Sequence, residues 1–457
     1  MRDILIGHIN SKKLSEKPEL LYLILAPFFS IIFMVIFTPW NSVDGPTHFM
    51  ASYRYSNILM GLPEWSVRGS DQAIVTETAY GGSFSGVLKN FEFMCSDNVL
   101  IDNANNYKYM NYYNAFNYLP FIVSIIIGRL LNLGILPIGY LGRVVGAAFY
   151  IFLFYHSIKT TPVGKNIFAF ISLFPMTMHL ITSYTYDIAV LAVAFNFFAC
   201  FFRAIDQKTF QKREYTIELL LWCVALGLIK GGAYTGLLLL LVVLFDKKNS
   251  LQKNMIVILL ISAGLLTVLL SNIILNPSEK YFQFYNENLN KMEFSFIYKH
   301  PGEYFILWIN TVKLYCFPWL FEAIGTNAGY WQVFVVSSLP FALFMLVPTF
   351  VAGYSAHATE EVIINKKLLV ISIIVTLVYL YVTPATVLRD NLVTNTTIEY
   401  CTGRYFLPLF PLIFTVIVSL FSKPKQKPVG NMIILGSYLM YTILMCFVAF
   451  FFKQRFF

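Results

Sequence analysis

Asp44 and His48 are the first residues along the chain whose types and spacing could do chemistry. They lie in the stretch Asp44-Gly-Pro-Thr-His48-Phe, shortly after an apolar segment. Pro46 stands where a new helix would begin, so Asp44 can cap that helix and His48 falls one turn further along. This spacing predicts a carboxylate and an imidazole together at the membrane surface, where a lipid headgroup would lie. The structural alternative is an N-cap followed by a solvated histidine.

Asp187 is a second acid in an apolar setting. It ends the stretch Ser183-Tyr-Thr-Tyr-Asp187, at the turn between two apolar segments. An acid between two membrane-spanning segments is energetically costly unless it is paired or functional, although it could also cap the helix that follows. Opposite Asp44, it would complete a site of two carboxylates, as general-base chemistry on a hydroxyl group often requires.

Two cations could bind a phosphate. Lys230 lies between two apolar runs, in Leu-Ile-Lys230-Gly-Gly, where a lysine either extends to the headgroups or binds a phosphate. Arg404 opens a late apolar segment, in Thr-Gly-Arg404-Tyr405-Phe, where a planar guanidinium suits a phosphate. The alternative for Arg404 is an interfacial anchor helped by Tyr405. Weaker candidates for the same site are Arg389, Asp390, Glu399 and Glu322.

The composition is that of a membrane protein. Of the 457 residues, 57% are hydrophobic and 12% are charged, whereas soluble domains carry roughly a quarter charged residues. The mean hydropathy is +0.65. These values exclude a soluble enzyme, a disordered chain and a nucleic-acid-binding domain. At roughly 20 residues per span, the apolar residues predict an all-α polytopic membrane protein with about 10–12 transmembrane helices.

The apolar segments and the basic loops predict which side of the membrane each segment faces. The segment at 20–40 reads as a retained first span with a basic, cytoplasmic N-terminus. The single transmembrane domain, 1–457, then has two large outer loops, at 41–115 and 276–331. The second of these contains a weak apolar segment at 304–320, which we expect to be an interfacial helix.

Two apolar regions do not fit as ordinary transmembrane spans. Residues 116–133 read as a short or re-entrant helix dipping from outside, because only then do all the basic loops fall in the cytoplasm. Residues 216–229 and 231–245 read as a helical hairpin with Lys230 at its tip. With this topology the formal net charge of +9 lies in the cytoplasmic loops. It therefore indicates orientation and not an anionic partner such as a nucleic acid.

The cysteines and histidines predict neither a disulfide nor a metal centre. The six cysteines form no Cys-x-x-Cys motif, and we expect free thiols. Three of them fall in predicted spans, at Cys200, Cys223 and Cys446, and three fall outside, at Cys95, Cys316 and Cys401. The six histidines lack zinc-ligand spacing.

Five places carry a resemblance to a known family. They are Asp44-Gly-Pro-Thr-His48-Phe, residues 175–187, Lys230, His300-Pro, and Thr402-Gly-Arg-Tyr-Phe-Leu-Pro408. Together they resemble a bacterial family of polytopic membrane proteins catalogued as a domain of unknown function. That family is related to the GT-C superfamily of membrane glycosyltransferases, which use polyprenyl-phosphate sugars. Two positions depart from the family pattern, since Gly45 replaces a usual Glu and Thr402 a usual Gln.

The resemblance implies a GT-C-like fold and an inverting sugar transfer on the outer face of the bacterial plasma membrane. Asp44 would be the general base, with His48 and Asp187 orienting the acceptor or the sugar. Arg404, Lys230 and Arg389 would bind the donor phosphate. Further substrate contacts would come from Tyr405, Glu399, Glu322 and His300. The acceptor would be a cell-surface glycan, such as a cell-wall polysaccharide or a teichoic acid, and no cofactor is required, although a divalent metal is compatible with the site.

Two other function classes fit the same sequence. A lipid-linked oligosaccharide polymerase or ligase would use the same cations for a pyrophosphate. A polysaccharide or lipid transporter (flippase) usually has repeated halves and charges at mid-membrane in several spans. Here the charges favour the outer edge, so the sequence favours the glycosyltransferase.

Overall fold

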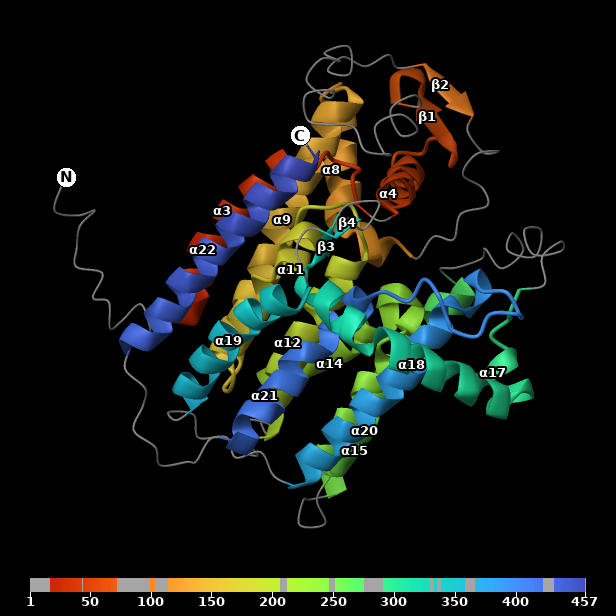
Figure 1. Cartoon of the computed structure of the whole chain (residues 1–457). Coiled ribbons are helices and arrows are strands. Elements are labelled where there is room, and N and C mark those ends of the chain that lie inside the picture. The colour runs from red at the N-terminus through yellow and green to blue at the C-terminus, as the bar shows by residue number, and fades with distance from the viewer. Residues whose placement is uncertain are drawn as a thin grey trace.

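Helices form almost all of the regular structure in the described part of this computed structural model (Figure 1). The structure describes residues 17–42, 44–71, 99–102, 114–205, 212–245, 251–274, 291–328, 333–334, 338–357, 366–421 and 431–456. This confirms the predicted all-α polytopic class.

The first half of the chain runs from a long helix through a small layer to a group of packed helices. Its elements are α3 (Pro18–Ile36), α4 (Gly45–Leu59), β1 (Ser66–Arg68), β2 (Leu100–Asp102), η2 (Ala115–Tyr118), α8 (Leu119–Leu130), α9 (Ile135–Thr160), α10 (Lys165–Ser172), α11 (Pro175–Ile181), α12 (Asp187–Ile205) and α14 (Arg213–Leu228). Here and below, η marks a 3-10 helix.

The second half alternates short 3-10 turns with long apolar helices. Its elements are η3 (Ile229–Gly232), η4 (Thr235–Leu244), α15 (Leu251–Ile274), α17 (Phe296–Lys299), α18 (Pro301–Ile324), β3 (Asn327–Ala328), β4 (Val333–Phe334), α19 (Ser338–His357), α20 (Lys366–Val382), η5 (Pro384–Asp390), η6 (Gly403–Tyr405), η7 (Leu407–Leu409), α21 (Phe410–Phe421) and α22 (Asn431–Phe456). Among the described residues the strands form two antiparallel pairs, β1 with β2 and β3 with β4.

Eight helices of the described residues are long and apolar enough to cross a membrane. Three more apolar helices are shorter, at Ala115–Leu130, Thr235–Leu244 and Leu339–Tyr354. The sequence predicts about 10–12 transmembrane helices, and the described residues contain these eight candidates. The segments Ala115–Leu130 and Thr235–Leu244 are too short to span a hydrocarbon core of about 30 Å.

The helices pack as a closed ring around a buried centre. Each of the following contacts the next, and the last contacts the first: α3, α9, α12, α14, α15, η4, α20, α21, α19 and α22. Helices α10 and α11 lie inside the ring, and all of their residues except Lys165 are buried. On the outside of the ring, large apolar side chains such as Ile31, Phe152 and Leu259 are exposed, as lipid-facing side chains would be.

The segment at 116–133 is short, as predicted, and forms one arm of a helical hairpin with α9. Helix α8 lies against the first half of α9, where Gly142 faces Ser124 and Gly146 faces Phe121. These glycines let the two helices approach closely. The 12 residues of α8 rise about 18 Å, too little for a crossing, whereas the 26 residues of α9 rise about 39 Å.

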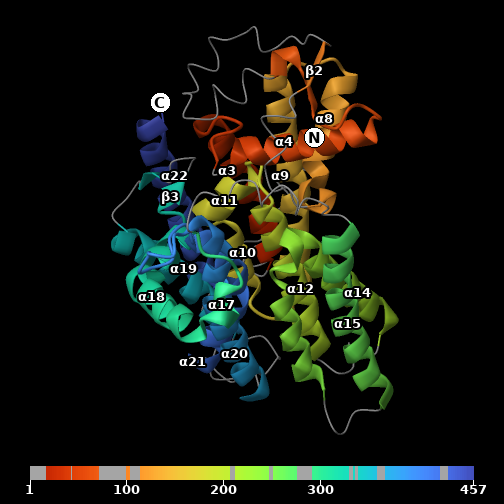
Figure 2. The ribbon, with the colours of Figure 1, turned by 90° about the vertical axis from the view of Figure 1, so that its right-hand side faces the viewer.

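The layer formed by α4, β1 and β2 caps one end of the ring (Figure 1). In Figure 2 the lower ends of α12, α15 and α20 lie at the opposite end of the molecule from this layer. Basic residues Arg203, Arg213 and Lys366 occupy helix ends on that opposite side.

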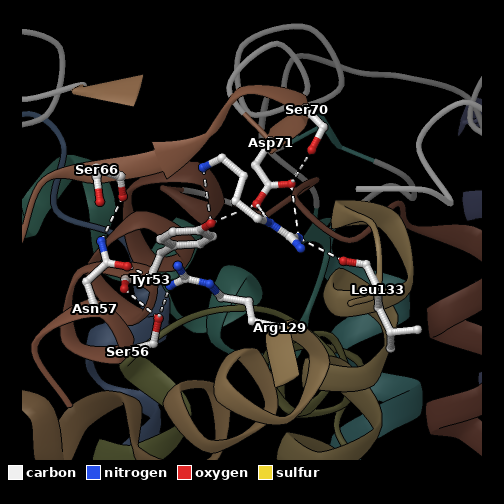
Figure 3. Close-up of polar contacts among 9 residues, drawn as sticks. Tyr53, Ser56, Asn57, Ser66, Ser70, Asp71, Arg129 and Leu133 are labelled. Carbon is white, nitrogen blue, oxygen red and sulfur yellow. Dashed lines mark hydrogen bonds and ion pairs between the residues drawn. The ribbon is translucent and has the colours of Figure 1, made fainter. Parts of the chain in front are cut away.

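A buried polar network fixes the capping layer to the α8–α9 hairpin (Figure 3). Tyr53 of α4 donates a hydrogen bond to Asp71, which also pairs with Arg68 at 2.8 Å. Arg68 donates in turn to the carbonyl of Leu133, just before α9. Arg129 of α8 donates to the Asn57 side chain at 2.6 Å, so both helices of the hairpin are tied to the layer that carries Asp44 and His48.

A helix covers the segment at 304–320 and is longer than the apolar segment that predicted it. Helix α18 spans Pro301–Ile324 and crosses the direction of α19 and α21 (Figure 1). The C-terminal end of α18 packs on η6, the segment that carries Arg404.

Candidate functional site

Four predicted residues from distant parts of the chain meet where the capping layer covers the ring. Asp187, at the start of α12, accepts a hydrogen bond from Lys230 Nζ through Oδ1 at 3.2 Å. Its other oxygen, Oδ2, pairs with Arg404 Nε at 3.0 Å. The side chains of Asp187, Lys230 and Arg404 are each less than 10% exposed. We call these three residues with Asp44 the charged cluster.

Asp44 lies at the solvent side of the charged cluster. Its Oδ2 is 3.8 Å from Arg404 Nη2, and its side chain is 55% exposed. The predicted capping role is wrong, because the Asp44 side chain makes no cap hydrogen bond to α4. Its left-handed backbone, with φ at 58°, turns the chain so that the carboxylate faces Arg404 instead. An acid left half exposed beside a buried cation is accessible to a substrate.

The tight turn before α4 leaves no room for a side chain at Gly45. A Cβ atom at this position would lie 2.6 Å from the carbonyl oxygen of Trp40 and 2.6 Å from Ser42 Oγ. Both atoms belong to a buried turn, so neither can move away easily. Any residue other than glycine would therefore strain this turn.

We predict that Gly45→Glu destabilises the protein by about 1–3 kcal/mol and adds no activity, because the new side chain must displace the Trp40 carbonyl. Thermal unfolding in detergent would measure the loss. Gly302→Ala is the matched control, since a Cβ there meets nothing within 4 Å. An unchanged melting temperature in Gly45→Glu would contradict the structural explanation.

Two tyrosines hold the Lys230 ammonium by cation–π contacts. Lys230 Nζ lies 3.8 Å from the ring centroid of Tyr405 and 4.9 Å from that of Tyr186. The Tyr186 ring also meets the edge of His48, with 4.6 Å between centroids. The Tyr118 hydroxyl lies 3.4 Å from His48 Nδ1. The predicted site residues His48 and Tyr405 thus belong to the wall around the charged cluster.

His48 is neutral at physiological pH. It lies on α4, outside the apolar helices, and burial lowers its pKa from 6.5 to about 4, against the opposing effect of Asp44. Between these two values the unfolded chain binds more protons than the folded chain, so the free energy of unfolding rises with pH. Above pH 6.5 this histidine contributes no pH dependence.

We predict that the folded protein loses up to about 3 kcal/mol through His48 as the pH falls from 6.5 to 4. Replacing His48 by Asn removes this contribution, because Asn does not titrate. The check is the free energy of unfolding of both proteins across this pH range. Parallel pH profiles for the wild type and His48→Asn would show that burial does not hold His48 neutral.

The turn that presents Lys230 depends on two asparagines that the sequence did not single out. Lys230 has a left-handed backbone, with φ at 45°, and its N–H donates to Asn117 Oδ1 at 2.8 Å. Asn114 donates to the carbonyl of Leu228 and to Ser271 Oγ. Lys230 lies at the turn between α14 and η4, as predicted. Asn114 and Asn117, just before α8, bond the backbone carbonyl and N–H groups of this turn.

The turn that presents Arg404 is built against α18. Glu322 Oε2 accepts a hydrogen bond from the backbone N–H of Gly403 at 2.7 Å. A Cβ at Gly403 would lie 1.9 Å from the carbonyl oxygen of Trp319, so only glycine fits this approach. Trp319 also donates to the carbonyl of Cys401. Glu322 is therefore a positioning residue for Arg404, and its carboxylate bonds to the backbone.

The remaining predicted residues lie further out. Arg389 is exposed on η5, next to Asp390, whose carboxylate interacts electrostatically with Asp44. Glu399 is exposed, and its backbone bonds to Asn391. The structure does not bring His300 to the cluster. It pairs with Glu303 at the N-terminal end of α18, about 33 Å along that helix from Glu322.

Arg143 is a buried charge that the sequence analysis missed. Its guanidinium lies in α9 and donates to the carbonyls of Phe37 and Thr182 at 2.7 and 2.5 Å. It thereby joins the end of α3 to the segment before Asp187. A single arginine inside the apolar stretch at 138–157 was the signal that could have identified it.

The cysteines and acids of the described residues form no disulfide and no metal centre. Five cysteines are free thiols, and Cys95 lies outside the described residues. Within the same described ranges, no group of three or more His, Cys, Asp or Glu side chains could hold a metal ion. What the charged cluster offers chemically is an anion-binding pair of cations beside an accessible carboxylate.

Comparison with known proteins identifies a family and nothing closer. Neither the curated proteins nor the solved structures contain a match to this chain. The family described as predicted membrane protein (DUF2142) matches residues 27–413, which is 387 of the 457 residues and includes the whole charged cluster. The chain is therefore a membrane protein that belongs to the DUF2142 family.

Proposed function

We propose that this protein is an inverting membrane glycosyltransferase that moves a sugar from a polyprenyl-phosphate donor to a cell-surface glycan. One observation carries the proposal: an accessible carboxylate, Asp44, lies 3.8 Å from a buried arginine that shares an acid with a buried lysine. A sugar transfer from a phosphate needs these two things side by side, a base for the acceptor and cations for the leaving group.

In the proposed reaction Asp44 takes the proton of an acceptor hydroxyl. The hydroxyl oxygen attacks the anomeric carbon from the face opposite the phosphate, and the bond between that carbon and the phosphate oxygen breaks. The phosphate leaves with the electron pair, so negative charge grows on its oxygens. Lys230 and Arg404 stabilise that charge from a water-poor site, where fixed cations act strongly.

The neighbouring residues would orient the substrates. His48 is neutral and next to Tyr118 and Tyr186, so it can exchange hydrogen bonds with a sugar hydroxyl without adding charge. Tyr405 covers Lys230, and Glu322 holds the Arg404 turn. Arg389 and Glu399, exposed on the same side, are candidates for contacts with the acceptor.

An apolar pocket lined by Phe406 would hold part of the lipid chain of such a donor. It has a volume of about 150 Å³ and lies between α18, α20 and α21. Its lining includes Trp319, Leu380, Phe406 and Ile413, and its surface is almost entirely apolar. Phe406 is two residues from Arg404, so a lipid whose chain enters here would carry its phosphate towards the cluster.

We place the reaction on the outer face of the bacterial plasma membrane. The capping layer and the charged cluster lie at the end opposite the basic helix ends, and basic ends face the cytoplasm in most membrane proteins. Lipid-phosphate sugars on the outer face would then meet a growing cell-wall polysaccharide or teichoic acid directly.

The test is a transfer assay with the full chain in lipid nanodiscs. Polyprenyl-phosphate sugars and glycan acceptors are supplied, with and without a metal chelator, and we expect release of polyprenyl phosphate together with a glycosylated acceptor. Activity only with diphosphate-linked oligosaccharides would indicate a polymerase or ligase. Movement of the lipid across vesicles without transfer would indicate a transporter.

A further inference from the structure

Asp187 occupies the place between the two cations that a substrate phosphate would take. Its two oxygens are divided between them, Oδ1 facing Lys230 at 3.2 Å and Oδ2 facing Arg404 at 3.0 Å. Two oxygens of one phosphoryl group would bind two separate cations in the same manner. The carboxylate is therefore positioned as an internal substitute for a phosphate.

Burial makes this substitution energetically important. Asp187, Lys230 and Arg404 are all nearly excluded from solvent, and an unpaired charge there would be costly. Without an anion between them, the two cations would also repel each other. Asp187 keeps the site stable when no ligand is bound, and it screens the cations from any anion that approaches.

We propose that Asp187 is a competing counter-ion that must give up at least one cation when a phosphate binds. This inference rests on the proposed function for the identity of the ligand, a lipid phosphate, and it replaces the orienting role that the sequence suggested for Asp187. An anion of the ligand then exchanges for the carboxylate on Lys230 or Arg404. After transfer, return of the carboxylate to that cation helps to release the phosphate product.

The surroundings of Lys230 fit such an exchange. Lys230 keeps its cation–π contacts with Tyr186 and Tyr405 whichever anion it faces, because these contacts are made to the rings and not to Asp187. Its backbone is held by Asn117 and not by Asp187. The ammonium can therefore change its anionic partner while the turn that carries it stays in place.

The test measures phosphate affinity in charge-altered variants. The full chain in nanodiscs is titrated with polyprenyl phosphate, with uncharged polyprenol, and separately with inorganic phosphate, which distinguishes a lipid headgroup from a free anion. We expect Asp187→Asn to bind polyprenyl phosphate about tenfold or more tightly than the wild type, because the competing charge is gone. Lys230→Gln should bind it more weakly than the wild type.

Two further variants serve as controls. Asp187→Glu keeps the competing charge and should not show the gain in affinity. Glu218→Gln removes a partly buried acid from its pair with Arg203, at the other end of α12 from Asp187, and should leave phosphate affinity unchanged. Equal or weaker phosphate binding by Asp187→Asn would overturn the inference and restore an orienting role for this residue.

A second measurement, the shift in melting temperature on adding phosphate, tests the inference even if Asp187→Asn is less stable than the wild type. A bound anion raises the melting temperature of the protein that it binds, so inorganic phosphate or polyprenyl phosphate should stabilise Asp187→Asn more than the wild type. A smaller shift than in the wild type would contradict the inference. If the wild type transfers no sugar while Asp187→Asn still binds polyprenyl phosphate more tightly, the proposed function is wrong and the counter-ion role remains.

Discussion

Asp44→Asn lowers kcat for sugar transfer by about 10²–10⁴-fold, the range that a positioned general base contributes. The amide has nearly the same shape but cannot take the proton of the acceptor hydroxyl. Donor binding should not suffer, because the change removes one of the two acids that face Arg404. The expected pattern is therefore a large loss of kcat with an unchanged or lower Kd for the polyprenyl-phosphate donor.

The control for Asp44 is Asp390→Asn. Asp390 is a nearby exposed acid, close enough to interact electrostatically with Asp44, and it makes no ion pair with Arg404. Removing it changes the local charge by the same amount, so its kcat should stay near the wild-type value. Full activity of Asp44→Asn, or an equal loss in both variants, would show that Asp44 is not the base.

Arg404→Gln lowers kcat/KM for transfer by about 10²–10³-fold, as expected when a preorganised group that stabilises developing charge is removed. Arg404 uses Nε towards Asp187 and Nη2 towards Asp44, so its planar guanidinium bridges the buried and exposed acids. Arg404→Lys restores the charge but offers one nitrogen in place of this fork, and we expect only partial recovery.

The matched control for Arg404 is Arg54→Gln. Arg54 lies on α4, where it pairs with Glu64 and stacks over the ring of Trp65. Neither partner belongs to the charged cluster. Its loss should leave kcat/KM within experimental error of the wild type. Wild-type transfer by Arg404→Gln, measured with the same donor, would remove Arg404 from the proposed leaving-group site.

The sequence could identify the members of the charged cluster because each is a charge in an apolar setting. Asp187 and Lys230 are conspicuous between apolar runs, and Arg404 opens one. What the sequence could not supply is their meeting, since Asp44 and Arg404 are 360 positions apart. Only the resemblance to a known family joined them before the structure did.

Two acids have surroundings in the structure that the sequence did not predict, for reasons that depend on packing. Asp44 was expected to cap α4, but the tight turn at Trp40 puts it in a left-handed conformation that directs its carboxylate to Arg404. Asp187 was expected to orient a substrate, yet it lies between two cations that come from remote turns. Neither arrangement follows from local propensity.

Residues that hold the site in place were hardest to predict. Asn114 and Asn117 have ordinary loop chemistry in the sequence, and their partners around Lys230 are more than 100 residues away. His300 illustrates the opposite error. Its His-Pro pair marks the start of α18 correctly, but the length of that helix places it far from the cluster.

The central claim is tested most directly by analysing both products of a single transfer reaction. The full chain is given one polyprenyl-phosphate sugar of known anomeric configuration and an acceptor, and the product linkage is determined by NMR. Our account predicts the inverted configuration, with one polyprenyl phosphate released for each sugar transferred. A retained configuration, release of a polyprenyl diphosphate, or lipid translocation with no new glycosidic bond would contradict it.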